Sequence, residues 1–290
     1  MDRRSFIAAG SLVAAATSAP AESIGRGGVR SAEPAPKWAL VLGGGTARGF
    51  AHIGVLKVLQ QNGLMPSLVV GCSAGALIGA LFASGMSALQ LEELALKVRD
   101  AEVADMVSGS KRGMVGGDAL QSFVNKHVQR VPIEKFKLPF ACVATNLTVG
   151  QATIFSSGDA GFAVRASSSI PAIFIPARSN DQEYVDGGLV SPLPVRIARE
   201  LGAEKVIAVS LNSGPQPGNP SGLFELLMQS FEIMAATITQ LEAREADVVI
   251  KPELGRIAFT DFSSRNLMVT LGEQAAKRAL PLIKSKLRVA

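Results

Sequence analysis

The sequence predicts an α/β fold, a three-layer α/β/α sandwich built around a largely parallel central sheet. Short apolar runs of the kind that form buried strands alternate along the chain with longer stretches of helical character. Strands that alternate with helices pair in parallel, because each helix returns the chain to the same edge of the sheet. With 290 residues, 48% of them hydrophobic and 18% charged, the chain can bury the core of such a sandwich.

The first 36 residues differ from the rest and are similar to an export signal followed by a linker. Arg3-Arg4-Ser5-Phe6-Ile7 resembles a twin-arginine motif, residues 6–16 are apolar, and Ala19-Pro20-Ala21 offers a small-residue exit. The apolar stretch covers about 11 residues, fewer than the roughly 20 that a membrane-spanning helix needs. We therefore expect a signal and linker over 1–36, one folded domain over 37–290, and export to the periplasm. The alternatives are a membrane-associated protein with an uncleaved N-terminus and a disordered basic N-terminus.

Apolar runs broken by glycine define the elements of the first half. Residues 38–42 and 68–70 are apolar throughout, which predicts two buried strands, each followed by a glycine-rich turn. A helix is predicted from the first turn through Gln61, and the Ala- and Leu-rich residues 74–83 predict another. The elements predicted next are surface helices at 89–98 and 118–128, a buried strand at 140–145 and an extended segment at 152–155.

Proline and glycine mark the elements of the second half. A helix predicted over 161–169 ends before Pro171, and a short strand at 183–185 ends at Asp186-Gly187-Gly188. A loop rich in proline, glycine and asparagine over 214–222 precedes a long predicted helix. The remaining predicted elements are a helix at 195–201, a strand at 205–211, helices at 223–244 and 271–287, and a strand at 248–250.

The charged and metal-binding residue types exclude several classes of partner. The net charge of +5 is modest, and scattered lysines and arginines with one tryptophan and one tyrosine argue against nucleic acid. The same charge is compatible with transient contact with a membrane surface. Cys72 and Cys142 lie in apolar runs, which predicts free buried thiols. No cluster has the spacing of a zinc or calcium site, so we expect no metal and no cofactor.

A G-x-S-x-G motif, Gly71-Cys72-Ser73-Ala74-Gly75, joins the second predicted strand to its helix. A sharp turn of this kind holds the central residue in a strained conformation, and the flanking glycines avoid Cβ clashes. The Ser73 hydroxyl is then exposed at the sheet edge, beside the Ala74 amide and the helix N-terminus. We interpret Ser73 as a nucleophile with half an oxyanion hole. The alternative is a tight joint in which serine is merely small.

The glycine-rich loop after the first strand, Gly43-Gly44-Gly45-Thr46-Ala47-Arg48-Gly49, is not a nucleotide site. Its glycines miss the dinucleotide spacing, no Asp or Glu occurs between Pro34 and Leu91, and no Gly-Lys-Ser/Thr follows. Backbone amides of Gly44 and Gly45 are instead suited to hold an oxyanion, unless the loop only satisfies a turn geometry. Arg48 either pins this loop by hydrogen bonds or meets a phosphate head group.

The base that would activate Ser73 is not a histidine in this reading. His52 lies on the apolar face of a predicted helix and His127 in a polar helix, and no histidine follows them. An α/β-hydrolase triad needs its histidine last in the chain. Asp186, at the end of a strand and before Gly187-Gly188, is the better proton acceptor if burial raises its basicity. An ordinary turn is the alternative for Asp-Gly-Gly.

Together these residues resemble the patatin-like phospholipase family over roughly residues 37–287. The resemblance implies a patatin-like α/β/α fold and a Ser–Asp dyad, with Ser73 as nucleophile, Asp186 as base, and an oxyanion hole of Gly44, Gly45 and Ala74. Thr46 departs from the glycine that many members carry, and Ser191 from asparagine. Four blocks match in order: the glycine loop continuing through Phe50-Ala51-His52-Ile53-Gly54-Val55-Leu56, then Gly71–Gly75, Arg165–Phe174 and Asp186–Gly188. The resemblance also assigns a supporting role in the site to Thr46, Arg48, Gly49, Gly71, Gly75, Gly187 and Gly188.

We therefore expect hydrolysis of a carboxylic ester in a lipid or phospholipid, by an enzyme of the phospholipase A, lysophospholipase or esterase type. Acyl transfer from the same acyl-enzyme is one alternative, and a lipid-binding protein with an unused serine is another. An acyl chain needs an apolar channel. Apolar residues of the long predicted helix suit such a channel, although they equally suit plain core packing: Leu223, Phe224, Leu227, Met228, Phe231 and Met234.

Overall fold

An eight-stranded sheet forms the centre of the fold, in a computed structural model that describes residues 38–212, 214, 222–255, 257 and 261–289. The strands are β1 (Trp38–Leu42), β2 (Leu68–Cys72), β3 (Phe140–Asn146), β4 (Gln151–Phe155), β5 (Ala177–Ser179), β6 (Gln182–Asp186), β7 (Lys205–Val209) and β8 (Val248–Ile250). Their order is β5-β6-β3-β2-β1-β7-β8, with β4 paired to β3. The neighbouring strands β3, β2, β1, β7 and β8 are parallel to one another. Strands β4 and β6 each pair antiparallel with β3, and β5 pairs antiparallel with β6.

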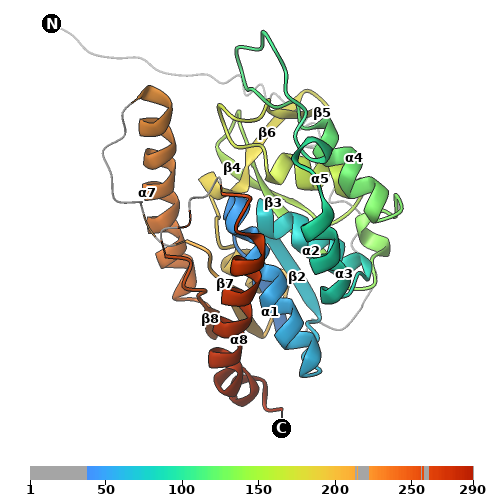
Figure 1. Ribbon diagram of the computed structural model, residues 1–290, viewed down its shortest axis with the longest axis vertical. Helices are drawn as coiled ribbons and strands as arrows, with labels where there is room; N and C mark the ends of the chain where they lie inside the picture. Colours follow the sequence, from blue (N-terminus) through green and yellow to red (C-terminus); the bar gives the residue numbers. More distant parts are fainter. Residues whose placement is uncertain (1–37, 213, 215–221, 256, 258–260, 290) are drawn as a thin grey trace, which may run out of the picture. The chain divides into compact units, whose positions relative to one another are not determined.

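Helices cover both faces of this sheet (Figure 1), which confirms the predicted α/β/α sandwich. The helices are α1 (Phe50–Gln61), α2 (Ala74–Ser84), α3 (Ala88–Lys97), α4 (Asp118–His127), α5 (Ala160–Ser167), α6 (Val195–Glu200), α7 (Leu223–Ala243) and α8 (Arg265–Leu287). The larger core lies on the face covered by α1, α2, α3, α4, α5 and α8. A smaller core on the opposite face packs α6 and the C-terminal end of α7 against β1, β2 and β7.

Two glycines allow α1 and α8 to touch backbone to backbone. A Cβ on Gly54 would lie 1.9 Å from the Val269 carbonyl oxygen, and one on Gly272 would lie 2.0 Å from the Ala51 carbonyl oxygen. Any larger side chain at either position would push the two helices apart. The predicted closing helix therefore begins earlier than its apolar pattern indicates, at Arg265, because its first turns pack closely on α1.

Apart from the start of α8, the ends of the predicted elements agree with the structure to within two residues, and two details differ. The structure adds the three-residue strand β5, which pairs with β6 and which no apolar run announced. Strand β7 ends at Val209 instead of Leu211, because the chain turns there toward the cavity described below. Cys72 and Cys142 are free and buried, as predicted. The predicted export signal and linker lie outside the described residues.

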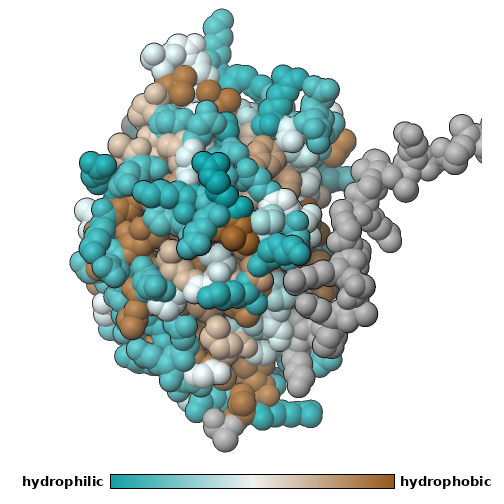
Figure 2. Space-filling model, turned by 90° about the vertical axis from the view of Figure 1, so that its right-hand side faces the viewer, coloured by the Kyte–Doolittle hydropathy of each residue, from teal (hydrophilic) through white to brown (hydrophobic). Residues whose placement is uncertain are grey.

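Helix α7, unlike the other long helix α8, exposes a cluster of large apolar side chains near its N-terminus. Its N-terminal half presents Leu223, which is 75% exposed, together with Phe224, Leu226 and Leu227. The face of the molecule on the side of α3 and α4, drawn in Figure 2, is mostly hydrophilic with small separate hydrophobic patches. No helix in the described part of the chain combines the length and apolarity that a bilayer crossing requires.

Candidate active site

Ser73 occupies the turn between β2 and α2 in a conformation that is rare for a residue with a side chain. Its φ is 53° and its ψ is −120°. The two motif glycines are needed for contact rather than for an unusual φ: a Cβ on Gly71 would lie 2.5 Å from the Gly75 carbonyl oxygen, and one on Gly75 would lie 2.0 Å from the Leu42 carbonyl oxygen. The sharp turn predicted from G-x-S-x-G is therefore present.

A second serine holds this turn from behind. The amide of Ser73 donates to Ser167 Oγ at 2.9 Å, and the Ser167 hydroxyl donates to the Val143 carbonyl oxygen at 2.6 Å. Ser167 is fully buried at the end of α5, so this relay connects the turn to β3 without solvent. Ser167 lies in one of the four blocks that resemble the family, but the sequence did not predict its structural role.

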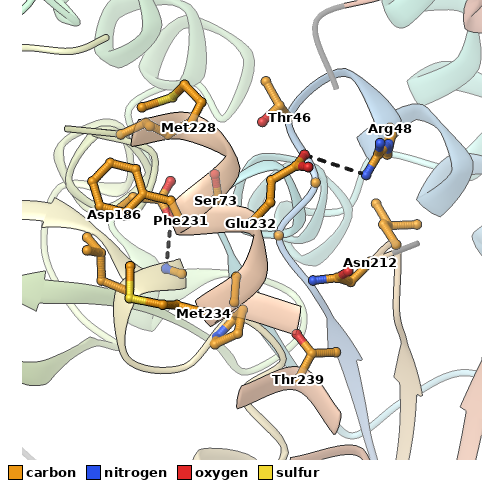
Figure 3. A pocket seen from close by; sticks show the side chains of 18 of the residues that line it. Thr46, Arg48, Ser73, Asp186, Asn212, Met228, Phe231, Glu232, Met234 and Thr239 are labelled. Carbon is orange, nitrogen blue, oxygen red and sulfur yellow. Dashed lines mark hydrogen bonds and ion pairs between the residues drawn. The ribbon is translucent and has the colours of Figure 1, made fainter. Parts of the chain in front are cut away.

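Asp186 ends strand β6 and is fixed through its backbone and one carboxylate oxygen. Its amide donates to the Ser169 carbonyl at 2.9 Å, and the Thr145 hydroxyl donates to its carbonyl at 2.8 Å. The Gly188 amide donates to Oδ1 at 2.7 Å, which Figure 3 draws as a dashed line. A Cβ on Gly187 would lie 2.2 Å from the Val143 carbonyl oxygen, so glycine is required for this close turn.

Burial makes Asp186 a stronger base than an ordinary aspartate. Asp186 is only 7% exposed to solvent, and this burial raises the pKa of its carboxyl group from 3.8 to about 6. Hydrogen bonding from the Ser73 hydroxyl and the Gly188 amide opposes that increase in pKa. Asp186 Oδ2 is buried and accepts no hydrogen bond from the described residues, so it is the carboxylate oxygen without a partner.

The amides of the glycine loop divide into occupied and open donors. Gly44 donates its amide to the Pro192 carbonyl at 2.9 Å, and therefore does not offer the free oxyanion donor that the sequence predicts at this position. The amides of Gly45 and Ala74 donate to no other residue in the described ranges. A Cβ on Gly45 would lie 2.8 Å from Leu211 Cδ1, which explains the glycine there.

Thr46 and Arg48 follow in a short 3-10 helix over Thr46–Gly49. Thr46 has a φ of 50°, in the left-handed region that glycine adopts freely and that strains a β-branched residue. Arg48 is buried, donates from Nε to the Ile257 carbonyl at 3.0 Å and lies 3.9 Å from Glu232 Oε1 through Nη1. Burial lowers its pKa, and Nη2 has no partner among the described residues.

These groups line one cavity of about 210 Å³ between the sheet edge and α7 (Figure 3). Ser73 and Asp186 both face it, so the structure brings the two predicted residues together. From α7 come Met228, Phe231 and Met234, whereas Leu223, Phe224 and Leu227 lie exposed outside it. Sequence reasoning missed its polar residues Glu232, Asn212 and Thr239, because they come from elements distant in the chain from both motifs.

Neither histidine lines this cavity. His52 is fully buried in α1, and burial lowers its pKa to about 4. The neutral ring therefore donates from Nε2 to the Gly43 carbonyl, 2.8 Å away, and supports the glycine loop from below. His127 is half-buried on α4 with Nδ1 2.8 Å from the Phe123 carbonyl oxygen. The expectation that His52 is a core histidine is confirmed.

Another carboxylate, Glu242 of α7, supports the loop that follows Asp186. It accepts hydrogen bonds from the Ser191 hydroxyl and, at 3.0 Å, from the Leu193 amide. Burial raises its pKa to about 7. Between its two donors lies Pro192, whose carbonyl holds Gly44, so Glu242 connects α7 to the glycine loop. The contact between Ser191 and Glu242 joins residues 51 positions apart, so local sequence could not reveal it.

The fold and this site define an α/β protein with a serine on a strand-to-helix elbow, the arrangement typical of serine acyl hydrolases. The sequence model of the patatin-like phospholipase family matches residues 40–199, more than half of the chain. The chain belongs to that family.

The chain matches different fractions of the length of its relatives. An uncharacterized NTE family protein of Mycobacterium tuberculosis is 34% identical over 182 residues, 61% of this chain and 49% of that protein. Patatin-like phospholipase domain-containing protein 6 of Mus musculus is 34% identical over 183 residues, 60% of this chain and 13% of that protein. This chain thus spans about half the length of the curated mycobacterial relatives it matches.

Among solved structures, ExoU of Pseudomonas aeruginosa, crystallised in complex with SpcU, shares the fold. The TM-score is 0.52 at 17% identity, and the match covers 87% of this chain and 53% of the ExoU chain.

Proposed function

We propose that the protein is a serine acyl hydrolase that cleaves carboxylic ester bonds of lipids, phospholipids among them, through an acyl-enzyme on Ser73. One observation supports this most: the Ser73 hydroxyl lies beside the buried Asp186 carboxylate in a shared cavity that neither histidine lines. A carboxylate with a pKa of about 6 is largely ionised at neutral pH and basic enough to accept a proton during attack.

In the first half-reaction Ser73 Oγ forms a bond to the ester carbonyl carbon as Asp186 takes the hydroxyl proton. The carbonyl oxygen becomes an oxyanion, for which the open amides of Gly45 and Ala74 are the proposed donors. Asp186 then returns the proton to the departing alcohol as the ester bond breaks. In the second half-reaction Asp186 deprotonates a water that attacks the acyl carbon, and the proton goes back to Ser73 as the acid leaves.

The exposed apolar half of α7 supports work at a lipid surface. Leu223, Phe224, Leu226 and Leu227 are exposed on the helix that also supplies Met228 and its neighbours to the cavity wall. An aggregate of exposed apolar side chains on one surface helix is typical of contact with lipids. A lipid that meets this helix is already beside the cavity that holds Ser73.

The experiment is hydrolysis of p-nitrophenyl esters and phospholipid vesicles by purified protein. We expect release of p-nitrophenol and fatty acid, and we expect Ser73→Ala and Asp186→Asn to abolish both while circular dichroism stays unchanged. Ser157→Ala, at an exposed serine far from the cavity in sequence, is the matched control for handling and folding. Full activity in either active-site variant would contradict the proposed dyad.

Export through residues 1–36 is proposed on the sequence pattern alone. Fractionation of cells that produce the whole chain tests it, and a full-length chain in the cytoplasm would contradict it.

A further inference from the structure

The peptide unit between Gly43 and Gly44 is held at both of its polar ends. Its carbonyl oxygen, on Gly43, accepts a hydrogen bond from His52 Nε2 at 2.8 Å, and its amide, on Gly44, donates to the Pro192 carbonyl at 2.9 Å. The next peptide unit carries the Gly45 amide, one of the two proposed oxyanion donors. Because peptide units are planar and joined through a single Cα, the orientation of the first unit restricts where the Gly45 N–H begins and points.

Three successive glycines make the loop dependent on such contacts. Glycine has no Cβ and adopts a wide range of φ and ψ, so residues 43–45 do not fix the path of the loop by themselves. An oxyanion hole stabilises the developing charge only if its donors already point at the oxygen. Side chains that hold this loop therefore control catalysis even if they never touch the substrate.

Glu242, near the C-terminal end of α7, holds the segment that supplies the Pro192 carbonyl. One carboxylate oxygen accepts the Ser191 hydroxyl, and the other accepts the Leu193 amide at 3.0 Å. These two donors flank Pro192, which has no amide hydrogen through which it could be fixed directly. Glu242 is only 6% exposed, so water competes little for either hydrogen bond.

The peptide unit is thus held by two helices that cover different faces of the sheet. His52 belongs to α1, on the face of the larger core, and the C-terminal end of α7 packs against the smaller core on the opposite face. Neither His52 nor Glu242 is among the described residues that line the cavity of Ser73. Their contact with the reaction is therefore through the backbone of the glycine loop.

We propose that Glu242 is a positioning residue for the oxyanion hole and acts through Pro192 and Gly44 on the direction of the Gly45 amide. This inference rests on the proposed function and adds to it a side chain that does not touch the substrate. Without the carboxylate the segment around Pro192 moves, and the Gly45 amide meets the oxyanion at a poorer angle. Both half-reactions pass through an oxyanion, so both slow together, whereas the ground-state ester binds as before.

Ester kinetics of Glu242→Ala, Glu242→Gln and Glu245→Ala test this role. Loss of a whole oxyanion donor costs about 10²–10³ in kcat, so a misdirected donor in Glu242→Ala is expected to cost about 10- to 100-fold, with KM within about twofold of wild type. Glutamine has the shape of glutamate and keeps an acceptor for the Leu193 amide, so Glu242→Gln is expected to retain kcat within about fivefold. Glu245→Ala removes an exposed ion pair with Arg196 and is the matched control with unchanged kcat.

Inhibition by phenylboronic acid separates positioning from a general loosening of the fold. The Ser73 oxygen bonds to boron as the hydroxyl proton passes to Asp186, which gives a tetrahedral boronate with an oxygen in the oxyanion hole. We expect the inhibition constant to rise in Glu242→Ala by about the factor by which kcat falls. A role confined to stability would leave the inhibition constant of the folded protein unchanged.

Hydrogen exchange adds a measurement that does not depend on turnover. The hydrogen bond to Pro192 protects the Gly44 amide, and Glu242→Ala is expected to speed exchange of that amide by about tenfold or more relative to Gly79 inside α2. Nuclear magnetic resonance of protein with isotope-labelled glycines measures both amides. Ser191→Ala removes one of the two donors to Glu242, is expected to give a smaller increase, and covers the case in which Glu242→Ala does not fold.

The outcomes separate this inference from the proposed function. No ester hydrolysis by the wild-type protein would overturn the proposed function, and exchange of the Gly44 amide would still decide whether Glu242 holds the loop. Hydrolysis by Glu242→Ala at the wild-type kcat, or an unchanged inhibition constant, would overturn the positioning role and leave the function standing. Unchanged exchange of the Gly44 amide in both Glu242→Ala and Ser191→Ala would overturn it as well. So would a loss of kcat in Glu242→Gln as large as in Glu242→Ala, because the hydrogen bonds would then not be its cause.

Discussion

The side chain of Ser167 holds the backbone amide of Ser73, with 2.9 Å between Ser167 Oγ and the Ser73 nitrogen. Two residues further on, the carbonyl of Ser169 accepts the amide of Asp186 at 2.9 Å. One short segment at the C-terminal end of α5, residues 167–169, therefore fixes the two residues proposed for the reaction. The third block of family resemblance is thus a clamp between the serine turn and the aspartate turn.

We predict that Ser167→Ala disturbs the serine turn. The change leaves the buried Ser73 amide and the Val143 carbonyl without their partner, which costs about 1–3 kcal/mol of unfolding free energy. We also expect kcat to fall while KM changes little, because the nucleophile and not the substrate cavity is released. Urea unfolding and ester kinetics measure both effects, with the exposed Ser156→Ala as control. Unchanged kcat in Ser167→Ala would show that the relay does not position Ser73.

Asp186→Asn is predicted to stabilise the fold as it removes activity. Because the folded pKa of about 6 exceeds the ordinary 3.8, the folded state loses stability as pH rises between these values, and the loss is complete above about pH 6. A neutral asparagine avoids this cost, which amounts to about 3 kcal/mol. Thermal unfolding should show a gain for Asp186→Asn at pH 8 that disappears near pH 4. An equal effect at both pH values would mean that Asp186 is not a destabilised carboxylate.

Thr46→Gly is predicted to relieve backbone strain in the glycine loop. A left-handed φ costs a residue with a Cβ about 1–2 kcal/mol, and the greater freedom of glycine in the unfolded chain returns part of that gain. The net effect expected in urea unfolding is a gain of up to about 1 kcal/mol. Thr46→Val keeps the β-branched shape and the strain, so it should give no gain. Equal stability of the two variants would remove strain as the explanation.

Glu242→Ala is predicted to weaken the loop after Asp186. The change leaves the Ser191 hydroxyl and the Leu193 amide unpaired, and the expected loss in urea unfolding is about 1–3 kcal/mol. Glu245→Ala, three residues on, removes an exposed ion pair with Arg196 and should cost about 0–1 kcal/mol. Comparable losses in the two variants would contradict the assigned role of Glu242.

Local sequence predicted the parts of this site that depend on local geometry. The glycines around Ser73 and after Asp186 announced close turns, because only glycine tolerates the backbone contacts found at Gly75 and Gly187. The scarcity of histidine, with none after His127, argued against a Ser-His-Asp triad. Strand β5 escaped prediction, because it has three residues and its pairing with β6 carries no apolar pattern of its own.

The parts that could not be predicted depend on residues far apart in the chain. Whether the Gly44 amide is open is decided by the Pro192 carbonyl, almost 150 positions later in the numbering. The same holds for Ser167 behind Ser73, for Glu232 near Arg48 and for Glu242 beside Ser191. Each is a contact between elements that only the folded sheet brings together, and none leaves a trace in local composition.

The most direct test of the central claim is the pH dependence of covalent labelling of Ser73 by a fluorophosphonate probe, followed by peptide mass spectrometry. Attack on phosphorus needs the same proton acceptor as attack on an ester. The account predicts label on the peptide that contains Ser73, with a rate that rises with pH to a plateau through a midpoint near 6, the pKa of Asp186. In Asp186→Asn the rate should fall by about two orders of magnitude or more. Labelling of Asp186→Asn at the wild-type rate, or label on another residue, would contradict it.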